Sequence, residues 1–133
     1  MIRFSKKVEY ALMAIKFISS SSPRLVTARE ISEKINIPYD LLSKILQRLK
    51  SENILSSTQG THGGYLLAES PDKIYLSQVM QAMDADKALT ECLESGKEGE
   101  CCLEDTCSIK TPLTRLQQEV EELFKSKTIS DLV

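Results

Sequence analysis

The sequence predicts a mainly α-helical protein with one small β-hairpin. Three patterns favour this class: apolar residues recur at helical spacing in several stretches, a glycine-rich turn joins two short β-prone runs within residues 54–68, and leucines keep a 3-4-3 spacing near the end. With 133 residues the chain suits one or two small domains, and a core of this size buries roughly two-thirds of the unfolded surface. We therefore expect a compact fold that needs no disulfide bonds.

The first helix is expected from about Ser5 to Ser19, before a serine-rich break. One apolar stripe at helical spacing consists of Val8, Ala11, Leu12, Ile15 and Ile18, and a second consists of Tyr10, Met13 and Phe17. A helix that is apolar on two sides is usually buried between two layers, so we expect both stripes to be covered. Glu9 and Lys16 share one polar face, since they are seven residues apart.

The second helix has a distinct start signal. Thr27 and Glu30 match a capping box, in which each side chain accepts a hydrogen bond from the backbone N–H of the other residue. Val26 and Ile31 stand in the positions of a hydrophobic staple. The helix should span residues 28–35.

A third helix is expected from Pro38, which suits the first helical position, to about Ser51. Its apolar face consists of Leu41, Leu42, Ile45, Leu46 and Leu49, and its polar and basic surface of Tyr39, Asp40, Ser43, Lys44, Gln47, Arg48 and Lys50. A short helix, a tight turn and a longer helix of this kind indicate a helix-turn-helix, whose second helix enters the major groove of DNA. Two packed helices whose charges face water would leave the same pattern.

A β-hairpin is expected directly after this helix, with strands at residues 54–58 and 65–68 around a glycine-rich turn. This order indicates a winged helix-turn-helix. Candidates at the wing tip for contact with phosphate or the minor groove are Gln59, Thr61 and His62. The glycines of the turn could equally serve only to allow positive φ angles.

Two further helices complete the prediction. The first follows a turn at residues 70–72, with Ser77 as its N-cap and an apolar side made of Val79, Met80 and Met83. The second opens at Thr111–Pro112, and its apolar stripe consists of Leu113, Leu116, Val120 and Leu123. This stripe suffices for packing against a partner subunit. We expect a winged helix-turn-helix DNA-binding domain at residues 1–76 and a cysteine-rich loop with a long dimerisation helix at residues 77–133.

Charge is divided unevenly along the chain. Residues 1–70 carry 10 Lys and Arg against 6 Asp and Glu, a net +4, whereas residues 71–133 carry 7 against 13, a net −6. The first part could face an anion such as nucleic acid, although ordinary solvated faces give the same pattern. No stretch approaches the roughly 20 apolar residues of a membrane span and no signal-peptide pattern is convincing, so we expect a cytoplasmic protein without a membrane partner.

All four cysteines lie within sixteen residues, as Cys92, Cys101, Cys102 and Cys107. In a reducing compartment such a group indicates a metal-ligand set or a redox sensor. Thiol catalysis would need a base, but the only histidine, His62, is separated in sequence from these cysteines. The chain also has no phosphate-binding loop and no zinc-protease signature. We therefore expect neither enzyme activity nor a small-molecule substrate.

Together these motifs resemble, over essentially the full length, the Rrf-two-type winged-helix regulators of bacteria. The segments that carry the resemblance are residues 9–12, 28–37, 41–49 and 60–68 and the cysteine loop. Residues 88–92, Cys107 and residues 129–132 are most similar to regulators of the sulfur-mobilisation (SUF) cluster-assembly operon, with nitric-oxide-sensing repressors the close second. The resemblance implies a homodimer, a palindromic DNA operator and an iron–sulfur cluster, expected to be 2Fe–2S. It also implies a transcriptional regulator, expected to be a repressor, of iron–sulfur cluster assembly genes.

The resemblance implies the cysteine ligands as well. The family's pattern of a cysteine, five residues and a cysteine selects Cys101 and Cys107, and Cys92 is the third ligand. Cys102, with four residues before Cys107, is the alternative. Otherwise Cys102 is a buried thiol, a reserve ligand or an oxidation site.

The expected fourth ligand is Glu9. One branch of the family uses a histidine at the position that Lys110 occupies here, and a cationic lysine does not serve. Other branches use an acid at the position of Glu9, supplied by the second subunit. A carboxylate suits such an iron less well than a thiolate, which would leave the iron displaceable. Glu9 could equally be an exposed helix carboxylate.

Contacts with DNA also follow from the resemblance. Lys44, Arg48 and Lys50 would contact phosphates or bases, and Tyr39, Asp40 and Ser43 lie near the start of the recognition helix. Gln59 stands where many relatives carry an arginine that is assigned to the minor groove, so the chain departs from the family there. A dimer would read half-sites about one helical turn, or a multiple of it, apart.

Two alternatives keep DNA binding without a cluster. The three cysteine ligands and a carboxylate could form a tetrahedral zinc site, or the thiols could form a redox switch. In the cluster hypothesis, a change of ligation moves the final helix against the winged-helix unit and alters the distance between the two recognition helices.

Overall fold

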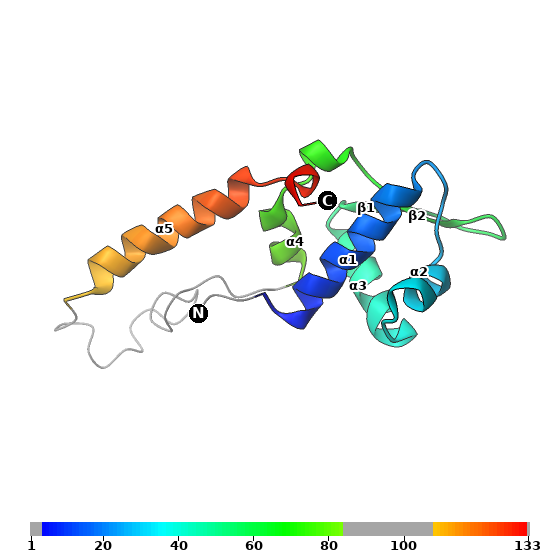
Figure 1. Ribbon diagram of the computed structural model, residues 1–133, viewed down its shortest axis with the longest axis horizontal. Helices are drawn as coiled ribbons and strands as arrows, with labels where there is room; N and C mark the ends of the chain where they lie inside the picture. The colour runs from blue at the N-terminus through cyan, green and yellow to red at the C-terminus, as the bar shows by residue number, and fades with distance from the viewer. Residues whose placement is uncertain (1–3, 84–107, 133) are drawn as a thin grey trace.

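The computed structural model describes residues 4–83 and 108–132 (Figure 1). In chain order its elements are α1 (Lys6–Ser21), α2 (Ala28–Ile35), α3 (Tyr39–Ser51), β1 (Leu55–Thr58), β2 (Gly64–Leu67), the 3-10 turn η1 (Pro71–Lys73), α4 (Leu76–Ala82), α5 (Lys110–Ser126) and the 3-10 turn η3 (Ile129–Asp131). The hairpin and α5 project from opposite ends of the globular part. The predicted class, mainly α with a two-stranded wing, is confirmed.

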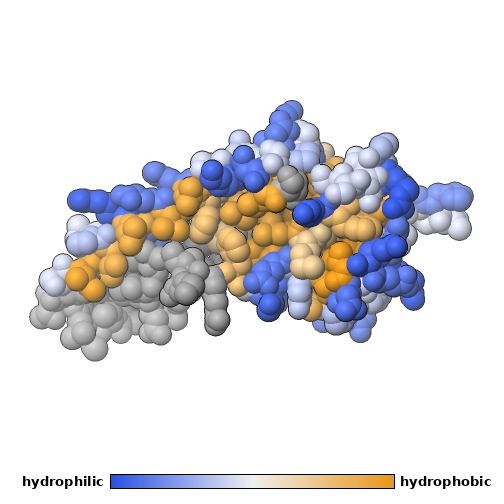
Figure 2. All heavy atoms as spheres, viewed as in Figure 1, coloured by the Kyte–Doolittle hydropathy of each residue, from blue (hydrophilic) through white to orange (hydrophobic). Residues whose placement is uncertain are grey.

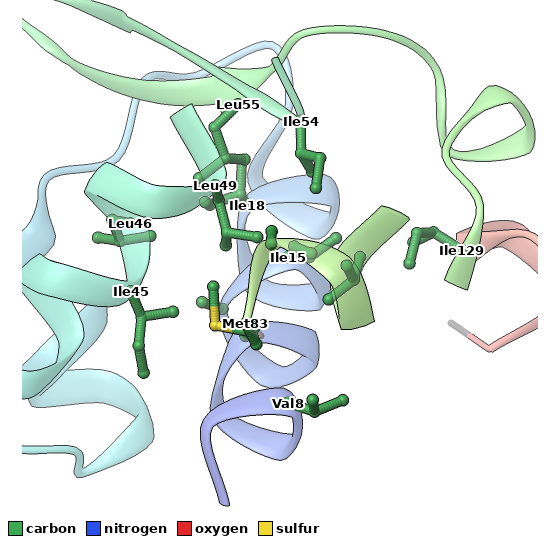
Figure 3. Close-up of a cluster of buried hydrophobic side chains, with 14 of the residues drawn as sticks. Val8, Ile15, Ile18, Ile45, Leu46, Leu49, Ile54, Leu55, Met83 and Ile129 are labelled. Atoms are coloured by element: carbon green, nitrogen blue, oxygen red, sulfur yellow. The ribbon is translucent and has the colours of Figure 1, made fainter. Parts of the chain in front are cut away.

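The core forms where α1, α3 and α4 meet (Figure 3). Its aliphatic residues from the first two of these helices are Val8, Ala11, Ala14, Ile15, Ile18, Leu42, Ile45, Leu46 and Leu49. Burial of one large side chain of this kind stabilises a fold by about 1.5–3 kcal/mol. The second apolar stripe of α1 is covered only in part: Tyr10 and Phe17 are half-buried against the core, whereas Met13 remains 43% exposed. The first stripe is therefore the more deeply buried side of α1.

Local hydrogen bonds fix the ends of α2 and α3. The Thr27 hydroxyl oxygen accepts a hydrogen bond from the Glu30 N–H at 3.1 Å, which confirms Thr27 as the N-cap of α2. The Glu30 carboxylate is bound by Arg24, with 2.9 Å between nitrogen and oxygen. Asn36, in the left-handed conformation with φ 57°, ends α2. Pro38 is the N-cap of α3 instead of its first helical residue, because its ψ of 133° is extended.

The wing is an antiparallel hairpin whose strand bounds lie within one residue of the predicted ones. At its turn, a Cβ on Gly63 would collide with the carbonyl oxygen of Thr58, so the close approach of the two strands requires glycine there. The other edge of β2 pairs with the segment before α2, since the Tyr65 N–H donates to the Val26 carbonyl oxygen at 2.7 Å. The wing is therefore attached to the helix-turn-helix through the outer edge of β2 as well as through the chain from α3 to β1.

The start of α4 differs from the prediction. Its N-cap is Tyr75, whose backbone N–H donates to the side-chain oxygen of Gln78 at 2.7 Å, and Ser77 lies inside the helix. Leu76 is only 4% exposed, so the helix begins where this side chain enters the core. Ser77 is therefore not the cap that its residue type indicates.

A short two-stranded contact holds the end of α5 against the start of α4. We call residues 74–76 and 127–129 the C-terminal clamp. The Leu76 N–H donates to the Lys127 carbonyl oxygen at 2.8 Å, and the Ile129 N–H donates to the Ile74 carbonyl oxygen at 2.8 Å. Ile129 is fully buried in the common core. The core thus includes residues on both sides of position 76, and the division at that position stays a prediction.

One apolar face of α5 is open. Leu116 is 47% exposed and Leu123 is 51% exposed. Figure 2 shows apolar side chains along α5 that continue toward the centre of the molecule. Neither α5 nor any other helix in the described part of the chain is long and apolar enough to cross a membrane.

Candidate nucleic-acid interface and metal ligands

The outer face of α3 lies opposite its buried leucines and isoleucine. Because successive helical residues are about 100° apart, this face consists of Asp40, Ser43, Lys44 and Gln47. These side chains are exposed, apart from the half-buried Ser43. Tyr39 and Lys50 lie on one flank of this face and Arg48 lies on the other. The geometry is that of a helix that can enter a major groove with polar side chains toward the base edges.

Tyr39 is positioned by a residue that the sequence did not single out. The Arg29 guanidinium lies 5.4 Å from the centre of the Tyr39 ring, a cation–π distance. Tyr65 of the wing is close to this pair: burial, followed by the proximity of Tyr39, raises the pKa of the Tyr65 hydroxyl. Tyr39 is 46% exposed, so one side of its ring remains accessible. The pairing depends on how α2 crosses α3, and no residue pattern in the sequence reports that angle.

Arg48 is directed toward α4. Its Nε donates a hydrogen bond to the carbonyl oxygen of Ala82 at 3.1 Å, in a partly buried contact. Ala82 is the last residue of α4, where a cation is favoured by the unpaired carbonyl groups of the last turn. This hydrogen bond therefore connects the recognition helix α3 to the last residue of α4, two residues before position 84.

The three candidate residues of the wing tip, Gln59, Thr61 and His62, are all exposed. The hairpin that carries them extends away from the globular part (Figure 1). This exposure is what contact with a nucleic acid requires. The contact itself stays a prediction.

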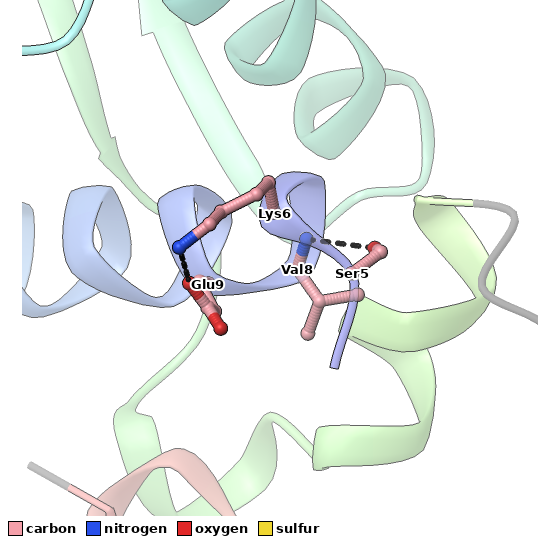
Figure 4. Close-up of polar contacts among 4 residues, drawn as sticks. All are labelled: Ser5, Lys6, Val8 and Glu9. Carbon is pink, nitrogen blue, oxygen red and sulfur yellow. Dashed lines mark hydrogen bonds and ion pairs between the residues drawn. The ribbon is translucent and has the colours of Figure 1, made fainter. Parts of the chain in front are cut away.

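Glu9 lies in the first turn of α1, which is capped by the Ser5 hydroxyl (Figure 4). Its carboxylate oxygen Oε2 is 3.0 Å from Lys6 Nζ. The side chains are 45% and 77% exposed, respectively, and the hydrogen bond to Glu9 raises the pKa of Lys6. Exposed pairs of this kind contribute little stability. The Glu9 carboxylate is therefore accessible to a metal centre of another subunit.

The four cysteines fall within residues 84–107, which are outside the described residues. In residues 4–83 and 108–132, no group of three or more His, Cys, Asp and Glu could hold a metal ion. The donors of such an ion would have to include residues 84–107 or a second copy of the chain. Thiolates are the usual donors of iron–sulfur clusters, so Cys92, Cys101 and Cys107 suit such a group, with Glu9 accessible as a further donor.

The sequence and the fold match known regulators. The family model described as "Rrf2: Iron-dependent Transcriptional regulator" matches residues 4–133. The HTH-type transcriptional regulator IscR of Sodalis glossinidius is 31% identical over 133 residues, which cover 99% of this chain and 79% of that protein.

Two solved structures have the same fold. CymR, titled the global cysteine regulator of B. subtilis, matches with a TM-score of 0.76 and 22% identity over 99% of this chain and 96% of that one. IscR of T. potens matches with a TM-score of 0.73 and 20% identity over 98% of this chain and 85% of that one. Members of this family regulate transcription by binding DNA and are not enzymes. From the match over residues 4–133 and the shared winged-helix fold, we conclude that the chain belongs to the Rrf2 family of transcriptional regulators.

Proposed function

We propose that this regulator is a homodimer that binds a palindromic operator under the control of an iron–sulfur cluster, as a repressor of iron–sulfur cluster assembly genes. The observation that carries the proposal is the position of the four cysteines between α4, which is bonded to the recognition helix, and α5, which has an open apolar face. The family's description as iron-dependent supports iron as the metal. Cys92, Cys101 and Cys107 would hold the cluster, with Glu9 of the second subunit as the fourth ligand and Cys102 as the alternative.

The open face of α5 supports the dimer. Its apolar residues are Leu113, Leu116, Val120 and Leu123, of which the second and fourth are about half exposed. Large aliphatic side chains at this spacing pack well against the same face of a second helix. Two copies of α5 would therefore bury these leucines and carry the two recognition helices to adjacent half-sites.

The cysteine-containing segment is joined at both ends to elements that bear on DNA binding: it follows α4 and leads into α5. Its first end follows Met83, directly after the carbonyl group that accepts the hydrogen bond from Arg48. Its second end leads into α5, whose far end is fixed by the C-terminal clamp. When bound, an iron–sulfur cluster supplies a redox-active centre whose weakest ligand is exchangeable. A change in this segment thus acts on α3 through Arg48 and on the dimer through α5.

The test is purification in the absence of oxygen, with measurement of iron, acid-labile sulfide and visible absorption. The expected result is a brown protein with iron and sulfide in comparable amounts. Cys92→Ser and Cys107→Ser should lose both iron and sulfide, whereas Cys102→Ser should keep them and serves as the matched control. A colourless wild-type protein with stoichiometric zinc would reject the cluster.

A second candidate function is a thiol switch without a metal. The observation that favours it is Cys102, which adjoins Cys101 and provides a thiol beyond the three ligands. In this case mild oxidation of metal-free protein would form a disulfide and change the affinity for DNA. Wild-type protein whose DNA affinity responds to oxidation without iron, and no longer responds after Cys102→Ser, would favour the switch over the cluster. A response of iron-loaded protein to nitric oxide alone would favour the nitric-oxide-sensing branch.

A further inference from the structure

A cavity of about 190 Å³ lies on the flank of the recognition helix that faces α1 and the end of α4. Its floor is apolar and consists of Leu41, Ile45, Ala82 and Met83. Its rim is cationic and consists of Lys7 from α1 with Lys44 and Arg48 from α3. We call this site the basic notch. Among the described residues, none that lines it is acidic.

The two lysines of the basic notch are in no ion pair within the described part of the chain. The ion pairs found there are Lys6–Glu9 and Arg24–Glu30, so neither Lys7 nor Lys44 is in one. Lys44 and Arg48 are one helical turn apart, and Lys7 reaches the same cavity from another helix. The like charges of Lys7 and Lys44 converge on one cavity and repel each other, and an anion in the cavity removes that repulsion.

We propose that the basic notch binds the phosphate backbone of DNA beside the groove that α3 enters, and that Lys7 is a phosphate contact. Duplex DNA carries one negative charge per about 1.7 Å of its axis, which complements a row of cations along a helix flank. The notch is continuous with the outer face of α3, because Lys44 belongs to both. The proposal rests on the DNA-binding part of the proposed function and adds α1 to the surface that touches DNA.

The apolar floor favours a backbone contact over a pocket for a small anion. Lysine side chains commonly lie along apolar surface with the ammonium group in water, which places the charges at the rim. Lys7, Lys44 and Arg48 are all exposed residues, and the Nε of Arg48 is already bonded to Ala82. A small anion at the rim would therefore only replace water around solvated ammonium groups. The phosphates of a DNA backbone would contact the three cationic side chains together.

The test measures DNA affinity against salt concentration for wild type, Lys7→Gln and Lys16→Gln, on a mixed-sequence duplex long enough for two half-sites. Lys16 is the matched control because it is exposed on α1 and nine residues from Lys7, about 180° around the helix. Iron content and thermal unfolding of each variant confirm that the protein is otherwise unchanged. Lys7→Arg keeps the charge and provides the rescue.

Lys7→Gln should weaken binding about three- to tenfold at low salt and reduce the slope of log affinity against log salt by about 2, because each subunit of the dimer loses one phosphate contact, equally for operator and non-operator DNA. Lys16→Gln should match wild type, and Lys7→Arg should restore the slope. A Lys7→Gln protein with the wild-type slope would overturn the notch while leaving DNA binding intact. Competition by inorganic phosphate far beyond its effect as a salt would assign the notch to a small anion instead. Wild-type protein that binds no DNA at low salt would overturn the proposed function and the notch together.

Discussion

At the scale of single residues, one ion pair links acid stability to the start of the helix-turn-helix. The hydrogen bond from Arg24, with a smaller contribution from the backbone N–H of Thr27, lowers the pKa of the Glu30 carboxyl below its ordinary value of 4.5. A carboxyl whose pKa is lower in the folded state contributes its full stability above the unfolded-state pKa. That contribution is lost as pH falls through the lower folded-state pKa. Glu30 therefore stabilises the fold at neutral pH and stops doing so in acid.

Glu30→Gln should lower the free energy of unfolding at about pH 7 and have a smaller effect in acid, once the pH has fallen below the folded-state pKa and the wild-type carboxyl is also neutral. Urea unfolding of both proteins at the two pH values measures this difference. Glu33→Gln is the control, because Glu33 is an exposed residue on the same helix and outside the Arg24 ion pair. An equal difference between wild type and Glu30→Gln at both pH values would contradict the assignment.

Residue-level predictions held where the chemistry is local and failed where it is long-range. Thr27 was recognised as an N-cap because its hydrogen bond spans three residues. Ser77 was expected to cap α4 from its residue type, but burial of Leu76 moved the cap to Tyr75. The partner of Arg48 lies 34 residues away, so the sequence identified its charge but not its bond to Ala82.

At the scale of the elements, α5 carries the proposed association of two copies. Its leucines are exposed in one chain and sit on one face of the helix, while the opposite face is polar. Each leucine buried by association contributes about 1.5–3 kcal/mol, and a symmetric dimer buries each one twice. The dimer should therefore be sensitive to one charge on this face and insensitive to the same charge on the other.

Leu116→Glu should raise the dimer dissociation constant at least about a hundredfold, because two buried leucines are replaced by two charges. Sedimentation of the variant against concentration measures the constant. Gln118→Glu adds the same charge on the opposite side of α5 and should leave the dimer unchanged. Circular dichroism should show that both variants keep their helices, since Leu116 is already 47% exposed in one chain. A Leu116→Glu protein that stays dimeric at all concentrations would contradict the role of α5.

The elements were the most predictable level of the structure. The helix α2 has the predicted bounds, α5 and both strands begin within one residue of theirs, and each has a local signal: a cap, a proline or a glycine turn. The exception is the second stripe of α1, which periodicity predicts to be buried although Met13 is exposed. Periodicity reports that a face is apolar, whereas its cover depends on which elements pack there or on a partner outside the chain.

At the scale of the whole molecule, two sets of hydrogen bonds hold the helices on either side of the segment that contains the cysteines. Arg48 joins the end of α4 to the recognition helix, and the C-terminal clamp joins the start of α4 to the end of α5. The sequence could indicate the cysteines and, through family resemblance, the expectation that they bind a cluster. It could not indicate the Arg48–Ala82 hydrogen bond or the C-terminal clamp. Both join segments that are distant in the chain, and both use backbone carbonyl groups, which every residue type has.

Arg48→Ala should reduce the coupling between the cluster and DNA. Removal of the hydrogen bond to Ala82 separates α3 from the end of α4, so the affinities of the iron-loaded and iron-free forms should approach each other. Lys50→Ala is the matched control, since it removes a cation from the other flank of α3 and leaves the Ala82 contact intact. It should weaken both forms alike and preserve their ratio. If Arg48→Ala kept the wild-type ratio of the iron-loaded to the iron-free DNA affinity, the coupling would not depend on this hydrogen bond.

The most direct measurement of the central claim compares operator affinity of iron-loaded and iron-free wild-type protein at one salt concentration, with the dimer confirmed in both samples. Coupling between two sites in a protein is typically worth about 1–3 kcal/mol, so we expect the two affinities to differ by a factor of about 5–150. Cys92→Ser, prepared in the same way, should behave as the iron-free form throughout. Equal affinities of the two wild-type forms would contradict the account.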